Sequence, residues 1–203
     1  MNIEIRNITK TYGNLKANDS VSLQIPSGMI LGILGENGAG KSTLMKILSG
    51  LISADDGEIL VDGQPVTINS PEDAINLGIG MLHQEPRDFP SMSIMDDLRI
   101  GALNHPEKRK DIDLEALREL ASSLGFSLDF NGLVRKLTVG ERQELELVRL
   151  LYFGVQVLIL DEPTTGISLI QKNQLFGALR KLAEAGKSIL FVSHKLEEIQ
   201  SLC

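Results

Sequence analysis

The segment from residue 35 to residue 43 has the spacing of a phosphate-binding loop. It reads Gly-Glu-Asn-Gly-Ala-Gly-Lys-Ser-Thr and fits the pattern G-x-x-x-x-G-K-[ST]. Glycines let the backbone curl until several N–H groups face one anion, and a following helix N-terminus favours negative charge there. The residues expected to bind phosphate are Gly35, Asn37, Gly38, Ala39, Gly40, Lys41, Ser42 and Thr43.

Two adjacent acids, Asp161 and Glu162, follow an apolar run at residues 157–160. Catalytic and ligand-binding groups in open α/β sheets gather at the carboxyl ends of the strands. Beside a phosphate loop, Asp161 and Ser42 are expected to hold Mg²⁺, and Glu162 to orient and deprotonate a water that attacks the γ-phosphorus. Without the phosphate loop, the same two acids would be equally well explained as a helix-capping pair. No Asn-Lys-x-Asp motif occurs, which disfavours a guanine nucleotide.

The chain has 203 residues, enough for one domain or for one domain with an insertion. Its 20 basic and 27 acidic residues give a net charge of −7, which argues against a protein that binds along nucleic acid. The single cysteine, Cys203, excludes an internal disulfide. No signal peptide is recognised, and the longest apolar stretch, residues 150–160, is too short to span a bilayer. We therefore expect a soluble chain that reaches a membrane only through a partner.

Hydrophobic periodicity predicts strands and helices that alternate along the chain. Strands are expected at residues 3–8, 21–25, 29–34, 58–61, 79–82, 157–160 and 188–192. Helices are expected at residues 42–49, 71–77, 94–100, 114–124, after residue 140, and at residues 168–185 and 195–201.

This order of elements predicts an α/β fold with a P-loop NTPase core, a mostly parallel sheet with flanking helices. The first two strands alternate apolar and polar residues, and an antiparallel β segment is expected at the N-terminus. We assign residues 1–84 and 140–203 to the core. The more polar stretch between them, residues 85–139, is expected to form a helical subdomain.

Four segments occur in the order and spacing of the ATP-binding-cassette (ABC) ATPases, which the chain resembles over nearly its whole length. They are residues 35–43, 137–143, 157–163 and 193–194. The resemblance implies an ATPase that uses ATP and Mg²⁺ and couples hydrolysis to transport. Two cassettes then enclose two ATP molecules, and each phosphate loop faces the signature segment of the other cassette.

The resemblance also implies roles for three residues outside the phosphate loop and the acidic pair. Tyr12, expected in a loop after the first strand, looks like the aromatic residue that stacks on adenine. Gln84 resembles the glutamine that touches Mg²⁺ and the attacking water and that couples the site to transmembrane subunits. His194 resembles the histidine that contacts the γ-phosphate. We count Glu162, His194 and Gln84 as catalytic candidates, and Ser42, Gln84 and Asp161 as metal ligands.

The signature of the family usually reads Leu-Ser-Gly-Gly-Gln, and residues 137–141 here read Leu-Thr-Val-Gly-Glu. Thr138 keeps a hydroxyl and Gly140 keeps the close backbone approach, whereas Val139 replaces a glycine. Glu141 places a negative charge near the partner's triphosphate, which is unfavourable by like-charge repulsion. The same residues also fit a capping box at a helix start, and both interpretations can hold together. The loop after Glu162 ends in Ser168, where the family usually has Asp.

Val139 and the run at residues 77–84 resemble the sugar and nucleoside importer branch, in which one polypeptide often carries two cassettes. We therefore expect an N-terminal cassette that is cut short and that imports a small solute such as a sugar or nucleoside. Its expected partners are a second cassette, transmembrane permease subunits and a solute-binding protein, with no nucleic acid. Its expected location is cytoplasmic, on the inner face of the membrane.

Two other classes stay open at this point. One is a soluble cassette ATPase associated with translation or with DNA. DNA-associated cassettes normally carry a long heptad-rich insertion, which is missing from the roughly 120 residues between Lys41 and Asp161. The other is a catalytically degenerate regulatory cassette, because Glu141 and Ser168 depart from the family pattern.

Overall fold

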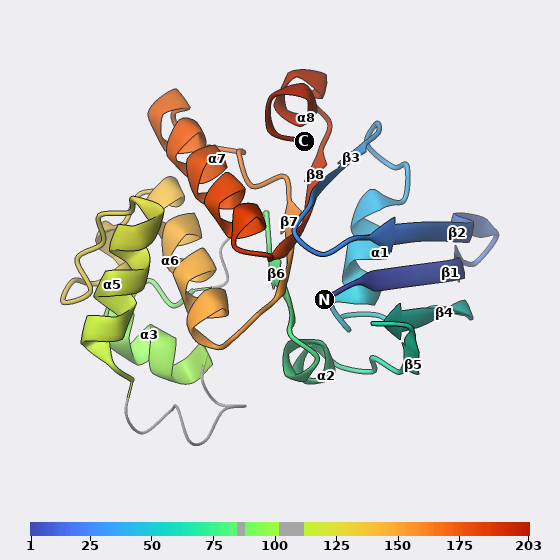
Figure 1. The fold of residues 1–203 in the computed structure, drawn as a ribbon, viewed down its shortest axis with the longest axis horizontal. Helices are drawn as coiled ribbons and strands as arrows, with labels where there is room; N and C mark the ends of the chain where they lie inside the picture. The colour runs from blue at the N-terminus through green and yellow to red at the C-terminus, as the bar shows by residue number, and fades with distance from the viewer. Residues whose placement is uncertain (85–87, 102–111) are drawn as a thin grey trace.

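The computed structural model of the chain describes residues 1–84, 88–101 and 112–203. In this part of the chain an antiparallel sheet and a parallel sheet, each of four strands, lie on the two sides of helix α1 (Lys41–Leu48). Figure 1 shows helices α6 (Val139–Tyr152) and α7 (Leu169–Glu184) beyond the parallel sheet, with α3 (Ile94–Gly101) and α5 (Leu114–Leu124) outside them. The layers therefore run from sheet to helix to sheet to helices.

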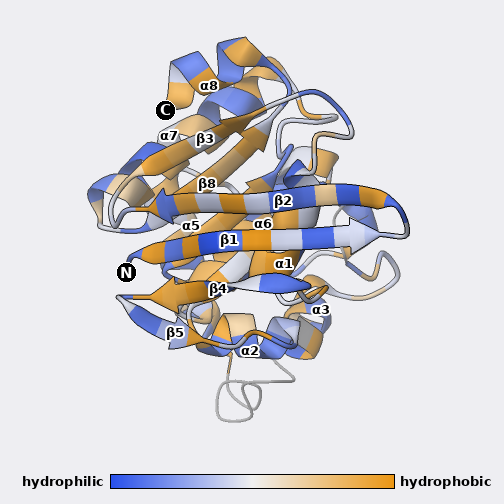
Figure 2. Ribbon diagram, turned by 90° about the vertical axis from the view of Figure 1, so that its right-hand side faces the viewer, coloured by the Kyte–Doolittle hydropathy of each residue, from blue (hydrophilic) through white to orange (hydrophobic). Residues whose placement is uncertain are grey.

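The antiparallel sheet has the strand order β2-β1-β4-β5 and faces the viewer in Figure 2. Its strands are β1 (Ile3–Tyr12), β2 (Leu15–Ile25), β4 (Asp56–Val61) and β5 (Gln64–Val66). The first two extend far beyond the strands expected at residues 3–8 and 21–25, and β5 has no counterpart among the expected strands. The tip of the β1–β2 hairpin is largely polar and partly exposed, so main-chain pairing rather than hydrophobic alternation continues the strands there.

Tyr12 is the last residue of β1 and pairs with Leu15 across the hairpin. The prediction that it lies in a loop after the first strand is therefore wrong. Its side chain is half exposed, and the ammonium of Lys10 lies 5.8 Å from the centre of its ring. Strand pairing fixes the backbone of Tyr12 and with it the direction in which the side chain leaves the strand.

The parallel sheet has the strand order β3-β8-β7-β6 and confirms the predicted α/β core. Its strands are β3 (Ile30–Leu34), β6 (Ile79–Leu82), β7 (Val157–Asp161) and β8 (Ser188–Ser193). Leu34 pairs with Ser193, and Asp161 pairs with Val192. The carboxyl ends of β3, β7 and β8 therefore finish side by side, and the residues that follow each strand emerge at one edge.

Apolar side chains fill both faces of the parallel sheet. On β7, Val157 and Ile159 pack with α1 and the antiparallel sheet, whereas Leu158 and Leu160 pack with α6 and α7. All four side chains are buried, and burying each contributes about 1.5–3 kcal/mol relative to exposure. This burial on both faces is the reason that the strand is a continuous apolar run in the sequence.

The described part of the expected helical subdomain contains α3, α5 and a short 3-10 helix, Val134–Lys136. Residues 85–87 and 102–111 of that stretch lie outside the described residues. Helix α5 begins after Asp113, whose carboxylate accepts hydrogen bonds from two backbone N–H groups, and ends at Gly125 in the left-handed conformation. The other α-helices of the described residues are α2 (Pro71–Asn76) and α8 (Leu196–Leu202).

We expect the turn after α1 to require glycine at position 50. Gly50 has φ +71°, and a Cβ built on it would lie 2.1 Å from the backbone oxygen of Ser70. Replacing Gly50 with Ala should cost at least about 3 kcal/mol of unfolding free energy, from the backbone strain and the steric overlap together.

Gly63 provides the matched control, because it has φ +80° with open space around a Cβ. Replacing Gly63 with Ala should cost only about 1 kcal/mol, from the left-handed backbone alone. Urea denaturation of the two variants measures the difference. Equal losses of stability would show that contact with Ser70 does not limit position 50.

Candidate functional site

The phosphate loop connects the end of β3 to the first turn of α1. Gly40 at its last turn has φ +83°, and a Cβ there would lie 2.1 Å from the backbone oxygen of Ala17, so only glycine fits. The ammonium of Lys41 donates to the backbone oxygens of Gly35 at 2.6 Å and Glu36 at 2.9 Å. These contacts close the loop into a ring that presents its backbone and the Lys41 charge to one cavity.

That cavity has a volume of about 450 Å³ and brings together residues from five separate segments. Seven of the eight phosphate-loop candidates, all of residues 37–43, line it together with three other predicted site residues. Those three are Tyr12 from β1, Gln84 from the segment after β6, and Glu162 from the end of β7. The structure therefore places most of the predicted site residues around one space.

Asp161 ends β7 and is buried beside the phosphate loop. Burial raises the pKa of its carboxyl above the ordinary value, although a hydrogen bond with Ser42 and the charge of Lys41 oppose the rise. Ser42, Asp161 and Gln84 offer a hydroxyl, a carboxylate and an amide oxygen, the hard oxygen donors that suit Mg²⁺. A cation at this place would favour the ionised form of Asp161, so the donor set fits the expected metal.

Glu162 and His194 form a direct pair, with 2.9 Å between a carboxylate oxygen of Glu162 and Nδ1 of His194. Glu162 has φ +50°, a conformation that is strained for a residue with a side chain, and its N–H donates to the backbone oxygen of Val192. His194 lines a neighbouring hollow together with Gly35 and Asn37. The pair thus stands between the phosphate loop and the start of α8.

Thr138 caps the start of α6, which begins at Val139 and not after Gly140 as expected. The Thr138 hydroxyl donates to the Glu141 carboxylate at 2.8 Å, and the Glu141 N–H donates back to that hydroxyl. The capping-box interpretation is therefore confirmed. None of the signature residues Thr138, Val139, Gly140 and Glu141 lines the cavity around the phosphate loop.

Gln171 joins the signature to the loop that follows Glu162. Its amide oxygen accepts from the N–H and the hydroxyl of Ser168, and its amide nitrogen donates to the Thr138 hydroxyl at 3.0 Å. A Cβ at Gly140 would lie 2.5 Å from this amide, so a larger residue there would displace the Gln171 side chain. Ser168, in the place of the family's usual Asp, serves as the N-cap of α7.

Several residues that shape the site were not predicted from the sequence. Leu15, Lys16 and Ala17 of β2 line the cavity, and the Asn18 amide donates to the backbone oxygen of Gly40 at 3.2 Å. No pattern in β2 indicated these contacts, because they depend on how the two sheets pack. Gln171 did carry a signal, since Ser168 and Gln171 have the spacing of a capping box.

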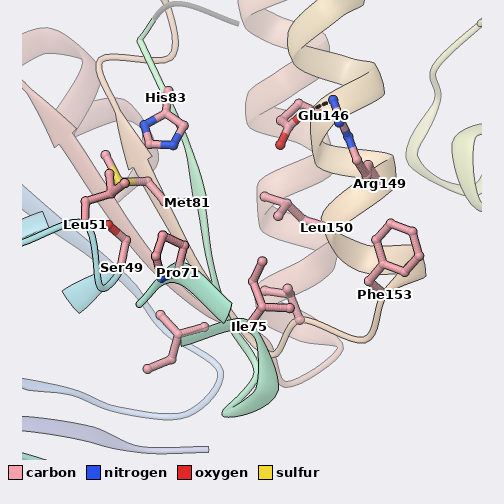
Figure 3. Close-up of a pocket in the computed structure, with 12 residues that line it drawn as sticks. Ser49, Leu51, Pro71, Ile75, Met81, His83, Glu146, Arg149, Leu150 and Phe153 are labelled. Atoms are coloured by element: carbon pink, nitrogen blue, oxygen red, sulfur yellow. Dashed lines mark ion pairs between the residues drawn. The ribbon is translucent and has the colours of Figure 1, made fainter. Parts of the chain in front are cut away.

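A second cavity, of about 230 Å³, lies between α2, β6 and α6 (Figure 3). Glu146 and Arg149 form an ion pair on its α6 wall, while Met81 and His83 lie on the opposite side. Burial raises the pKa of Glu146, and the charge of Arg149 opposes the rise. His83 directly precedes Gln84, so this cavity reaches the chain next to the phosphate-loop site.

Solved structures with the same fold define the class of the protein. A crystal structure of a nucleotide-free ATP-binding cassette from an ABC transporter matches with a TM-score of 0.88 and 25% identity, over 100% of this chain and 85% of that one. The ADP conformation of another ABC transporter cassette matches with a TM-score of 0.86 and 26% identity, over the same shares. The fold is that of an ATP-binding cassette.

Residues 18–165 match the ABC transporter family, and the chain belongs to that family. It is 39% identical over 98% of its length to the nucleoside import ATP-binding protein NupA of Lactococcus lactis. It is 41% identical over 98% of its length to the ribose import ATP-binding protein RbsA of Lacticaseibacillus paracasei. The chain spans about 40% of the length of these two relatives. Among the described residues, none of the helices has the length and apolar character needed to cross a membrane.

Glu144, one turn after Glu141 on α6, makes stability depend on pH. Burial, followed by the charge of Glu141, raises its pKa from 4.5 to about 7. The folded chain therefore holds a proton between about pH 4.5 and 7 that the unfolded chain has released, and stability falls as the pH rises through this window.

Replacing Glu144 with Gln should remove this loss. We expect the variant to melt at a higher temperature than the wild type at pH 8 by ~2–4 °C, about 1 kcal/mol, and at the same temperature near pH 4.5. Calorimetry across this pH range measures the effect, with Glu119→Gln on the exposed side of α5 as control. An equal difference at both pH values would contradict the assignment.

Proposed function

We propose that this chain binds Mg-ATP and hydrolyses it as a subunit of an ABC importer. The observation that carries the proposal is the shared cavity of the phosphate loop, Gln84 and Glu162, together with the Glu162–His194 pair. The names of the relatives support import of a nucleoside or a sugar such as ribose as the coupled process. We also propose that residues 1–84 and 140–203 form the ATPase core and that residues 85–139 form a helical subdomain.

In this proposal the phosphate loop binds the triphosphate through its backbone N–H groups, and Lys41 neutralises part of its charge. Ser42, Asp161 and Gln84 hold Mg²⁺, which supplies further charge neutralisation at the phosphates. Tyr12, at the end of β1, stacks on the adenine ring in this proposal. Each of these roles uses a side chain that lines the cavity or contacts a residue lining it.

Glu162 accepts the proton of the attacking water. Because an ionised carboxylate can only accept, the hydrogen bond to His194 places a proton on Nδ1 of the imidazole. This bond fixes the direction of the Glu162 carboxylate and leaves one of its oxygens for the water. Removing a general base typically costs ~10²–10⁴ in rate.

We further propose that two cassettes act together and that transmembrane permease subunits and a solute-binding protein complete the importer. The cassette would then lie at the cytoplasmic face of the membrane. We place the permease contact at the cavity of Figure 3, because its His83 wall leads directly to Gln84. The four signature residues would face the ATP that is held by the second cassette.

Replacing Glu162 with Gln should separate ATP binding from hydrolysis. The substitution keeps the size of the side chain but removes the proton acceptor, so the affinity for Mg-ATP should stay within about twofold while turnover falls ~10²–10⁴-fold. Calorimetry measures binding, and phosphate release measures turnover. Lys41→Ala serves as the comparison and should lose binding itself. Wild-type turnover in the Glu162→Gln variant would contradict the proposed base.

Replacing Glu141 with Gln should strengthen the ATP-dependent association of two cassettes. Glutamine can still accept at the capping box, but it removes a negative charge that would face the partner's triphosphate. Relief of about 1 kcal/mol corresponds to roughly fivefold tighter association. Sedimentation with Mg-ATP, in a Glu162→Gln background, measures it.

Glu115→Gln is the matched control, because Glu115 also lies in the first turn of a helix but belongs to α5. It should leave association unchanged. If both variants associate as the parent does, Glu141 does not face a triphosphate in the dimer.

A further inference from the structure

Glu198 on α8 is a buried carboxylate that receives hydrogen bonds from two loops. The Thr164 hydroxyl lies 2.9 and 2.8 Å from its two oxygens, and the Ser193 hydroxyl donates to it at 2.8 Å. The ammonium of Lys195 pairs with it at 3.2 Å. Glu198, Thr164 and Ser193 are all buried, and we call these three residues with Lys195 the Glu198 cluster.

The two hydroxyls belong to the segments that carry the candidate catalytic pair. Thr164 lies within the turn that starts at Glu162, where the Thr165 N–H donates to the Glu162 backbone oxygen. Ser193 immediately precedes His194, and its hydroxyl also accepts from the Lys195 N–H. Glu198 is therefore hydrogen-bonded to Thr164, two residues after Glu162, and to Ser193, one residue before His194.

The charge of Glu198 decides which groups donate in its hydrogen bonds to Thr164 and Ser193. Burial by itself would raise the pKa of its carboxyl, but hydrogen bonds from Ser193 and Thr164, together with Lys195, hold the pKa below its ordinary value. An ionised carboxylate only accepts, so both hydroxyls must donate to it. Bonds to a charged acceptor are about twice as strong as neutral ones, and burial protects them from competition by water.

The backbone of Glu162 needs such support. Its left-handed conformation is strained, and relaxation of the turn would carry the side chain away from His194. We propose that Glu198 is a positioning residue for ATP hydrolysis, because it ties the turn after β7 to the end of β8 and thereby keeps Glu162 and His194 in register. This inference rests on the proposed roles of Glu162 and His194.

Glu198→Gln is the closest test, because it preserves volume while replacing one acceptor oxygen with a donor group. We expect turnover to fall about 10–100-fold, as for a small misplacement of a catalytic group, while the affinity for Mg-ATP stays within twofold. Thr164→Val should reproduce the loss, and Thr164→Ser, which keeps the hydroxyl, should restore most of the rate. Glu197→Gln, on the exposed side of α8, is the matched control and should behave as the wild type.

A double-mutant cycle separates positioning from a general loss of stability. If Glu198 acts through Glu162, Glu198→Gln should cost nothing more once Glu162 is already Gln. Additive losses in the double variant would overturn the inference, as would wild-type turnover in Glu198→Gln.

A second readout does not require turnover at all. Long-range ¹H–¹⁵N spectra of the full chain report which ring nitrogen of His194 carries the proton. The wild type should show the Nδ1–H form set by Glu162, and Glu198→Gln should shift the imidazole toward the Nε2–H form. An unchanged His194 spectrum would overturn the inference even if the wild type hydrolysed ATP. A shifted spectrum in a chain without ATPase activity would support the positioning and contradict the proposed function alone.

Discussion

The parallel pairing of β3, β8 and β7 is the constraint on which the candidate site depends. Its register sets Leu34 opposite Ser193 and Val192 opposite Asp161, so three chain segments leave the sheet at one edge. The phosphate loop, the acidic pair and His194 begin at those positions, although they are separated by up to about 160 residues. Hydrogen bonds along the strands and apolar packing on both faces hold this register, because a slip by one residue would move each side chain from the face where it packs to the opposite face.

Around that edge the site residues are fixed by contacts that local structure alone does not supply. Gly40 is confined by the backbone of β2, Glu162 is strained and paired with His194, and Glu198 connects the two loops from the far side. Charged and strained groups of this kind persist where the surrounding structure holds them in place. The rigid sheet therefore positions the groups, and the short loops carry the chemistry.

The signature segment, residues 137–141, is held by hydrogen bonds between polar side chains. Thr138 directs its hydroxyl to Glu141 and receives a hydrogen bond from Gln171, so its bonding capacity is met inside the chain. Thr138 does not line the phosphate-loop cavity. Gln171 binds the loop after Glu162 as well, so a change in one segment displaces a partner of the other. Polar side chains make this connection.

Sequence alone determined the motifs and most of the elements that carry them. The phosphate loop, the apolar runs of β6 and β7, and the bounds of α5 were all predictable, because each depends on neighbouring residues and on a hydrophobic period. The tertiary structure decided what lies between distant segments. It placed Tyr12 within a strand, brought Ala17 and Asn18 of β2 against Gly40, and joined Glu198 to Thr164 and Ser193. Those contacts follow from the packing of two sheets and the docking of α8, for which a single sequence carries no periodic signal.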